Sequence, residues 1–185
     1  ITKAGRDNAQ VAVLYLNLDG FKEINDGAGH VVGDEVLRRA AARFVGAVRN
    51  SDTVSRIGSD EFVVVLSETV DEGAAMRLGE RLIQAMSEPL KVNQHSLILG
   101  VTVGLAIFPN DGATVDELLR NADVAMFRAK SQARCTVQAY RPELTRAAQQ
   151  RVEMTNALRR AIEASEIFLE YQPQCHPTSQ CDDRG

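Results

Sequence analysis

The stretch Val11-Ala-Val-Leu-Tyr-Leu-Asn-Leu18 is a nearly continuous apolar run, and Asp19-Gly20 ends it. A short run that is apolar at almost every position is typical of a strand whose two faces are both buried. We therefore predict a buried strand over residues 11–18. Asp19 can cap the short helix that we expect from Phe21 to about Asp26, with a break at Gly27–Gly29.

Helical and strand-like segments alternate further along the chain. Apolar residues recur at helical spacing from Val32 to Val48, which predicts an amphipathic helix. Short strands at 54–57 and 62–66 flank Gly58-Ser59-Asp60-Glu61 and predict a hairpin. This alternation indicates a mixed α/β fold, with helices over one or both faces of a central sheet. The other elements expected up to residue 140 are a helix from a Thr69/Glu72 capping box to about Met86, a β-rich stretch from Leu97 to Phe108 with bulges at Gly100 and Gly104, a helix from a Thr114/Glu117 capping box to about Ser131, and a strand at 136–140.

Composition limits the class of partner. The chain has 185 residues, of which 44% are hydrophobic, and its net charge is -4. The length fits one domain with a short appendage. The negative charge argues against nucleic acid or an anionic membrane as the main partner. An anionic ligand would need locally placed Lys or Arg side chains, or a metal ion.

Cysteine usage and hydropathy predict a cytoplasmic location. The three cysteines (Cys135, Cys175 and Cys181) are too few and too unevenly spaced for a disulfide framework, which favours a reducing compartment. No apolar run approaches the ~18–20 residues that span a bilayer. The chain opens with Ile1 rather than Met, so we expect a fragment of a longer protein, whose other parts could be tethered to a membrane.

Two clusters of polar residues are candidates for binding and catalysis. The first is Asn17-Leu18-Asp19 at the end of a strand, where open α/β sheets usually bind ligands; it is followed by Lys22, Asn25 and Asp34. The second is the adjacent carboxylate pair Asp60-Glu61 at the hairpin tip, which favours a hard divalent metal. The structural alternatives are a helix cap at Asp19 and a merely polar turn at the hairpin.

A third cluster is basic. Lys130 and Arg134 lie four residues apart near the end of a predicted helix, where they could hold phosphate oxygens. Alternatively, the two cations only complement the helix dipole. The chain has no Walker-type loop, no GxGxxG and no HExxH, so a P-loop or Rossmann interpretation has no support.

Together these residues resemble the GGDEF family of diguanylate cyclases. The stretch Leu16-Asn-Leu-Asp-Gly-Phe-Lys-Glu-Ile-Asn-Asp-Gly-Ala-Gly-His30, continued by Gly33-Asp34, is similar to the family pattern DxDxFKxINDxxGHxxGD. Arg56-Ile-Gly-Ser-Asp-Glu-Phe62 is similar to its RxGGDEF signature, and Ala122-Asp123, Ala129-Lys130 and Arg134 are similar to its late AD…AK…R segment. The resemblance implies a nucleotidyl-cyclase-like α/β (α+β) fold, with a central, mostly antiparallel sheet flanked by helices.

The resemblance also implies a substrate and its ligands. Members of the family condense two GTP into cyclic di-GMP, and each protomer of a homodimer presents one GTP to the other. By position, Asn25 and Asp34 would bind the guanine edge, because an amide and a carboxylate match its donors and acceptors. The residues that would hold the phosphates are Lys22, Lys130 and Arg134.

For the chemical step, the resemblance implies a site for Mg²⁺ (or Mn²⁺). Asn17, Asp60 and the backbone carbonyl of Leu18 would hold the metal. Asp60 and Glu61 would be the catalytic carboxylates, with Glu61 acting as a second-metal ligand or as the base for the attacking 3′-hydroxyl. In-line attack on phosphorus is the type of reaction in which metal ions neutralise developing charge.

Arg49-Asn-Ser-Asp52 matches the RxxD inhibitory site at which the family's product binds. Arginine suits both phosphates and guanine edges. A surface ion pair between Arg49 and Asp52 is the alternative interpretation of this short motif.

Two positions depart from the family pattern. Asn17 stands where active members carry a metal-binding aspartate, so the resemblance implies a weakened metal site. Ser59 replaces the second glycine and gives a degenerate GSDEF signature, in which the side chain could crowd GTP or donate a hydrogen bond. Two hypotheses follow: a weakened diguanylate cyclase, or a catalytically inactive module that senses GTP or cyclic di-GMP and regulates an attached EAL phosphodiesterase domain.

The EAL hypothesis comes from the C-terminal residues. The stretch 158–174, which ends in Tyr171-Gln-Pro-Gln174, resembles the start of an EAL domain. We therefore expect a GGDEF domain at 1–141, without its usual N-terminal opening segment, and then a connecting helix and the start of an EAL domain at 142–174. Within that second part we expect a helix at 144–164 and a strand at 167–171. Residues 175–185 do not continue the family pattern, and we expect a non-native or disordered tail there.

Overall fold

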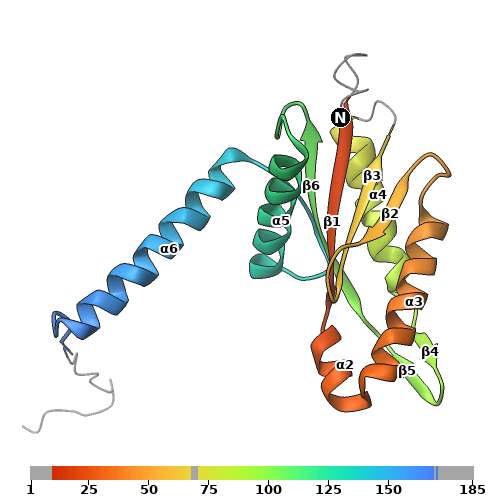
Figure 1. The fold of residues 1–185 in the computed structure, drawn as a ribbon, viewed down its shortest axis with the longest axis horizontal. Helices are drawn as coiled ribbons and strands as arrows, with labels where there is room; N and C mark the ends of the chain where they lie inside the picture. Colours follow the sequence, from red (N-terminus) through yellow and green to blue (C-terminus); the bar gives the residue numbers. More distant parts are fainter. Residues whose placement is uncertain (1–9, 68–70, 169, 171–185) are drawn as a thin grey trace, which may run out of the picture. The chain divides into compact units, whose positions relative to one another are not determined.

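The strand β1 (Val11–Asp19) lies in the middle of a five-stranded sheet with the order β2-β3-β1-β6-β7 (Figure 1). The structure is a computed structural model, and it describes residues 10–67, 71–168 and 170. β1 pairs antiparallel with β3 (Glu61–Leu66) and with β6 (Gly100–Phe108). β2 (Thr53–Arg56) pairs antiparallel with β3, whereas β7 (Val137–Ala139) runs parallel to β6. The predicted α/β fold with a mostly antiparallel sheet is confirmed.

Helices cover both faces of this sheet (Figure 1). One face carries α3 (His30–Ala47) and α4 (Glu72–Met86), and the other carries α5 (Val115–Gln132). Successive side chains of a strand point to opposite faces. Leu14, Leu16 and Leu18 therefore enter the larger core, and Val13 enters the smaller core beside α5. Burial on both faces explains why β1 is apolar at nearly every position.

Short elements complete the fold. The helix α2 (Phe21–Ala28) follows β1 and buries Phe21, and β4 (Leu90–Val92) with β5 (His95–Leu97) forms a separate two-stranded sheet. The last helix among the described residues is α6 (Pro142–Glu163). The chain divides into two units, residues 1–148 and residues 149–185. In the part of the chain that the structure describes, no helix combines the length and the apolar character needed to cross a bilayer.

The structure corrects the prediction for residues 97–108. Leu97 ends β5, and β6 begins only at Gly100. Neither Gly100 nor Gly104 forms a bulge, because the pairing of β1 with β6 is continuous from Val11 to Asp19. Gly104 has a different role. A Cβ there would stand 2.0 Å from the carbonyl oxygen of Ala122, so the glycine lets α5 approach the sheet.

Of the two predicted capping boxes, one is confirmed and one is wrong. The capping box at Thr114 is confirmed: its hydroxyl accepts from Glu117 N, and the Glu117 carboxylate accepts from Thr114 N. The capping box expected at Thr69 is wrong. The N-cap of α4 is Asp71, whose carboxylate accepts a hydrogen bond from Ala74 N at 2.6 Å, and Thr69 lies outside the described residues. A carboxylate at the N-cap can accept hydrogen bonds from the same free backbone N–H groups of the first helical turn as a threonine hydroxyl.

Other boundaries shift by a few residues. α2 continues through Gly27 to Ala28, so the chain breaks only at Gly29, whose φ is 85°. The strand predicted at 54–57 spans 53–56, and the helix predicted at 144–164 spans 142–163. The strand expected at 167–171 is not found at Ile167 or Phe168; Leu169 and Tyr171 lie outside the described residues.

Candidate functional site

The end of β1 lies against the tip of the β2–β3 hairpin. Leu18 N donates a hydrogen bond to the carbonyl oxygen of Asp60 at 3.0 Å. One step along the ladder, Asn17 is the direct cross-strand partner of Glu61. The fold therefore brings together the two halves of the predicted metal and catalytic set, although about forty positions of sequence separate them.

The hairpin tip is held by its own polar groups. The Arg56 guanidinium donates to the carbonyl oxygen of Ser59 at 3.0 Å, and Ser59 Oγ donates to Asp60 Oδ1 at 2.9 Å. Among the described residues, Ser59 is not one of those with a positive φ. The backbone at this position therefore does not require glycine, and the serine hydroxyl orients the neighbouring carboxylate.

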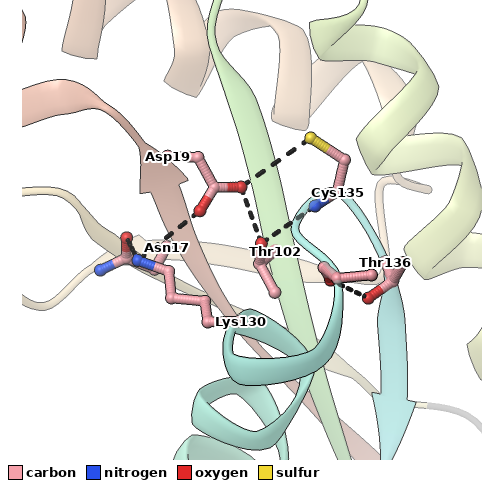
Figure 2. A network of polar contacts seen from close by, with 7 residues as sticks. Asn17, Asp19, Thr102, Lys130, Cys135 and Thr136 are labelled. Atoms are coloured by element: carbon pink, nitrogen blue, oxygen red, sulfur yellow. Dashed lines mark hydrogen bonds and ion pairs between the residues drawn. The ribbon is translucent and has the colours of Figure 1, made fainter. Parts of the chain in front are cut away.

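A polar network fills the space between the end of β1 and the end of α5 (Figure 2). Lys130 Nζ donates to Asn17 Oδ1 at 2.5 Å and lies 3.7 Å from Asp19 Oδ1. Thr102 Oγ1 donates to Asp19 Oδ2 at 2.7 Å, and Cys135 N donates to Thr102 Oγ1 at 3.2 Å. Asn17 and Asp19 share one face of β1, which explains why both meet the same lysine.

Burial makes this network electrostatically important. The side chain of Asp19 is only 7% exposed, whereas that of Lys130 is 29% exposed. Asp19 Oδ1 has no hydrogen-bond partner among the described residues. A buried carboxylate is costly unless a positive charge compensates it, so the Lys130 ammonium is the counter-charge of Asp19.

Two other titratable side chains, those of Tyr15 and Asp123, lie close to Glu61. Burial, reinforced by the charge of Glu61, raises the pKa of Tyr15 to about 12, and the Tyr15 hydroxyl donates a hydrogen bond to Glu61. Burial and then Glu61 also raise the pKa of Asp123 on α5. The raised pKa values mean that additional negative charge is unfavourable around Glu61, so a cation would be favoured there.

The predicted guanine ligands lie on the other side of the hairpin. Asn25 of α2 packs against Gly33, where a Cβ would stand 2.0 Å from Asn25 Oδ1. The next residue, Asp34, lines a cavity of about 350 Å³ between α3 and the hairpin. The other lining residues are Leu37, Arg38, Ala41, Arg56 and Phe62. The lining thus combines three apolar side chains with one carboxylate and two guanidinium groups. Apolar walls and a carboxylate suit a flat base that offers N–H donors.

The remaining predicted residues lie on exposed segments. Lys22 is exposed on α2, and Arg134 is exposed in the connection between α5 and β7. Arg49 and Asp52 form a turn between α3 and β2: Arg49 N donates to Asp52 Oδ2 at 2.9 Å, and Asp52 N donates to the Arg49 carbonyl at 3.0 Å. The carboxylate of the RxxD motif thus already accepts a backbone hydrogen bond.

Comparison with known proteins identifies this arrangement. Residues 1–136 match the family model described as diguanylate cyclase, GGDEF domain. The chain belongs to the GGDEF family. It is therefore a GGDEF domain of cyclic di-GMP signalling, related to diguanylate cyclases and to bifunctional cyclase/phosphodiesterase proteins.

The curated relatives of this GGDEF domain are much longer than the chain. It is 38% identical over 174 residues to the bifunctional diguanylate cyclase/cyclic di-GMP phosphodiesterase MucR of Pseudomonas aeruginosa, covering 94% of this chain and 25% of that protein. It is 38% identical over 163 residues to the cyclic di-GMP phosphodiesterase NbdA of the same organism, covering 88% of this chain and 21% of NbdA. The chain thus spans a quarter or less of these relatives.

Solved GGDEF structures share the fold. A structure of TpbB from Pseudomonas aeruginosa that comprises only the GGDEF domain has a TM-score of 0.77 and 37% sequence identity. It covers 80% of this chain, and the match covers 87% of that structure.

Cyclases of this family typically use Mg²⁺. The predicted ligands Asn17, Leu18 and Asp60 offer only oxygen atoms, which Mg²⁺ prefers, and Asp19 adds a buried oxygen without a hydrogen-bond partner. Within residues 10–67, 71–168 and 170, no group of three or more His, Cys, Asp or Glu side chains could hold a metal ion. The donor set fits Mg²⁺ in kind, but it is poor in carboxylates.

Sequence reasoning missed three members of the site. Thr102 and Cys135 contact Asp19, and Tyr15 contacts Glu61, but the sequence analysis named none of the three as a candidate site residue. The alternation along β1 could have placed Tyr15 on the face of Asn17. The contacts of Thr102 and Cys135 depend on how β6 and the segment before β7 pair, which local patterns do not reveal.

Proposed function

We propose that this GGDEF domain binds guanine nucleotide and is of diguanylate cyclase type, joining two GTP into cyclic di-GMP with an activity weakened at Asn17 and Ser59. The observation that carries the proposal is the position of the β2–β3 hairpin. The cross-strand pair next to its tip, Arg56 and Phe62, borders the cavity with Asp34, and the tip itself contacts the end of β1. A nucleotide lying across the tip would reach both the cavity and the strand-end carboxylates.

Each predicted residue has a defined task in this proposal. Asp34 accepts the N–H donors of guanine, and Asn25 completes the contact with the base edge. Lys22, Lys130 and Arg134 neutralise the triphosphate. Glu61, whose carboxylate also accepts a hydrogen bond from Tyr15, would accept the proton of the attacking 3′-hydroxyl or bind a second metal ion.

The reaction needs two copies of the domain. In each half-reaction the 3′-oxygen of one GTP attacks the α-phosphorus of the other, pyrophosphate leaves, and the hydroxyl proton passes to a base. A bound Mg²⁺, held by Asn17, the Leu18 carbonyl and Asp60, would neutralise charge on the phosphate oxygens. The proposal therefore includes a homodimer in which each protomer binds one GTP and presents it to the other.

A second candidate function is a sensor without catalysis. In this candidate the domain binds GTP, or cyclic di-GMP at Arg49 and Asp52, and regulates an EAL phosphodiesterase that follows residue 174. Two observations favour it: Asn17 brings no charge to the metal site, and the match to MucR extends over 174 residues, beyond the GGDEF model. The start of the EAL domain at 142–174 is part of this second candidate.

One experiment separates the two candidates. The purified domain is mixed with GTP and Mg²⁺, and then with GTP and Mn²⁺, while bound nucleotide and cyclic di-GMP are both measured. Formation of cyclic di-GMP supports the cyclase, and GTP binding without product supports the sensor. Binding of added cyclic di-GMP is measured separately. Absence of product together with absence of binding of either nucleotide would contradict both functions.

A further inference from the structure

We propose that Lys130 is a built-in cation of the β1 end: its ammonium group occupies the oxygen site formed by Asn17 and Asp19, and a divalent cation must displace it to bind there. The inference rests on the proposed function only in taking these oxygens as part of the metal site. It adds a competitor to that site, which is a residue of the chain itself.

The distances define an ammonium site. Lys130 Nζ donates to Asn17 Oδ1 at 2.5 Å and faces Asp19 Oδ1 at 3.7 Å, so one cationic group lies between two oxygens of neighbouring positions on the same strand face (Figure 2). Asp19 is fixed from its other side, because Thr102 Oγ1 donates to its Oδ2. The Asp19 Oδ1 atom is therefore directed at the lysine by contacts that do not involve the lysine.

Asp19 Oδ1 is also the atom that the protein leaves unsatisfied. It is buried and has no hydrogen-bond partner in the described part of the chain, and 3.7 Å from the ammonium is too long for a hydrogen bond. A single ammonium group thus satisfies Asn17 well and Asp19 incompletely. A small ion that prefers several oxygen ligands would use both atoms better.

The lysine can leave without unfolding the domain. Its side chain is 29% exposed, and it comes from the last turn of α5, where the helix is anchored by the buried Ala129 rather than by the ammonium. A flexible, partly hydrated ammonium is a displaceable cation. Two cations cannot share the site, since like charges about 4 Å apart repel by about 4 kcal/mol at an effective dielectric constant near 20.

This competition has a consequence for the nucleotide-free domain. Divalent cations must overcome both the missing carboxylate at Asn17 and the resident positive charge of Lys130. Removing the charge of Lys130 should therefore strengthen divalent-cation binding, even though the same change should weaken the grip on phosphate. A lysine that only contacts phosphate would not have the first effect.

The test is a Mn²⁺ titration of the nucleotide-free domain, followed by electron paramagnetic resonance of free Mn²⁺. The wild type is compared with Lys130→Met, with Lys130→Met/Asp19→Asn, and with Lys91→Met as a matched control on the exposed face of β4. We expect Lys130→Met to bind Mn²⁺ about tenfold more tightly. A change of this size is expected when one positive charge next to the site is removed in a medium of moderate dielectric constant. The double variant should lose this gain, and Lys91→Met should match the wild type.

Unchanged or weaker Mn²⁺ binding by Lys130→Met would overturn the proposal, and so would a gain that survives Asp19→Asn. If circular dichroism shows that Lys130→Met is unfolded, Lys130→Gln decides the question, because glutamine is uncharged and can still donate to Asn17. No nucleotide is present in this titration. Failure of GTP binding, which would contradict the proposed function, is therefore measured separately from failure of this inference.

Discussion

Gly104 of β6 lies directly beneath the backbone of α5 at Ala122. A Cβ at Gly104 would stand 2.0 Å from the Ala122 carbonyl oxygen and 2.3 Å from Met126 N. Both neighbours are backbone atoms, so no side chain can rotate away to make room. The position of α5, which carries Lys130 and Asp123, depends on this contact between strand and helix.

We therefore predict that Gly104→Ala lowers the free energy of unfolding by about 1–3 kcal/mol, the usual cost of overpacking a core. The matched control is Gly46→Ala in α3, where nothing lies within 4 Å of the added Cβ. That substitution should stabilise the domain by about 0.5–1 kcal/mol, because alanine is the better helix former. Urea denaturation followed by circular dichroism measures both. Equal effects of the two substitutions would contradict the close approach of α5.

Asn17→Asp should increase the affinity of the site for divalent cations. It adds one negative charge at the end of β1, beside a buried carboxylate that shares a single ammonium group. We expect about tenfold tighter Mn²⁺ binding and, if the domain is a cyclase, faster formation of cyclic di-GMP at low Mg²⁺ concentration. Asn93→Asp, the same chemical change in the β4–β5 turn, should alter neither quantity. No gain in Mn²⁺ binding would place the weakness of the site elsewhere than at Asn17.

The cavity beside Asp34 allows a steric test of nucleotide binding. Ala41 lines the cavity from α3, whereas Ala42 is the next residue and is exposed. Ala41→Trp should fill much of the space of about 350 Å³ and weaken GTP binding at least tenfold. Ala42→Trp adds the same side chain outside the cavity and should bind GTP like the wild type. Isothermal titration calorimetry measures both, and equal affinities would exclude this cavity as the base site.

The large features of the fold could be predicted from the sequence because each had a local signal. The apolar run at 11–18 indicated a strand buried on both faces, and the polar tip at 58–61 indicated a hairpin. The structure bears out both elements. The association of Asn17 with the hairpin followed only from the resemblance to the GGDEF family, since no local pattern states which strands pair.

What local patterns could not supply were contacts that depend on register and on helix approach. Gly104 was predicted to form a bulge because a glycine inside a strand often does. The structure shows instead that the glycine makes room for α5. The hydrogen bond from Thr102 to Asp19 likewise requires the register of β1 against β6, in which Asn17 faces Thr102. The β4–β5 hairpin was missed because its strands have only three residues each.

Cys135 should react slowly with thiol reagents although it is exposed. Burial of the sulfur and the charge of Asp19 raise the pKa of the Cys135 thiol above its ordinary value, and a raised pKa means less thiolate at a given pH. In a Cys175→Ser/Cys181→Ser background, reaction with 5,5′-dithiobis(2-nitrobenzoate) at pH 8 should be slower than that of a free cysteine. Asp19→Asn should accelerate it. A rate that does not respond to Asp19→Asn would contradict the coupling between these two side chains.

Glu117 should stabilise α5 only above acidic pH. Its carboxylate accepts hydrogen bonds from the backbone N–H groups of Ala113 and Thr114, and these bonds lower the pKa of Glu117 below its ordinary value of 4.5. A carboxylate with a lowered pKa binds fewer protons in the folded state. Its contribution to stability is therefore complete above the unfolded pKa, and it is lost as the pH falls through the folded pKa.

The variant Glu117→Gln isolates this charge, because glutamine keeps an oxygen that can accept from the same N–H groups. We predict that it is less stable than the wild type at pH 7 and that the difference shrinks as the pH falls from 5 to 3. Thermal unfolding across this range measures the difference, with Glu153→Gln in α6 as the control for loss of one negative charge on a helix. A difference between Glu117→Gln and the wild type that stays constant down to pH 3 would show that the capping box acts through its geometry and not through the charge of Glu117.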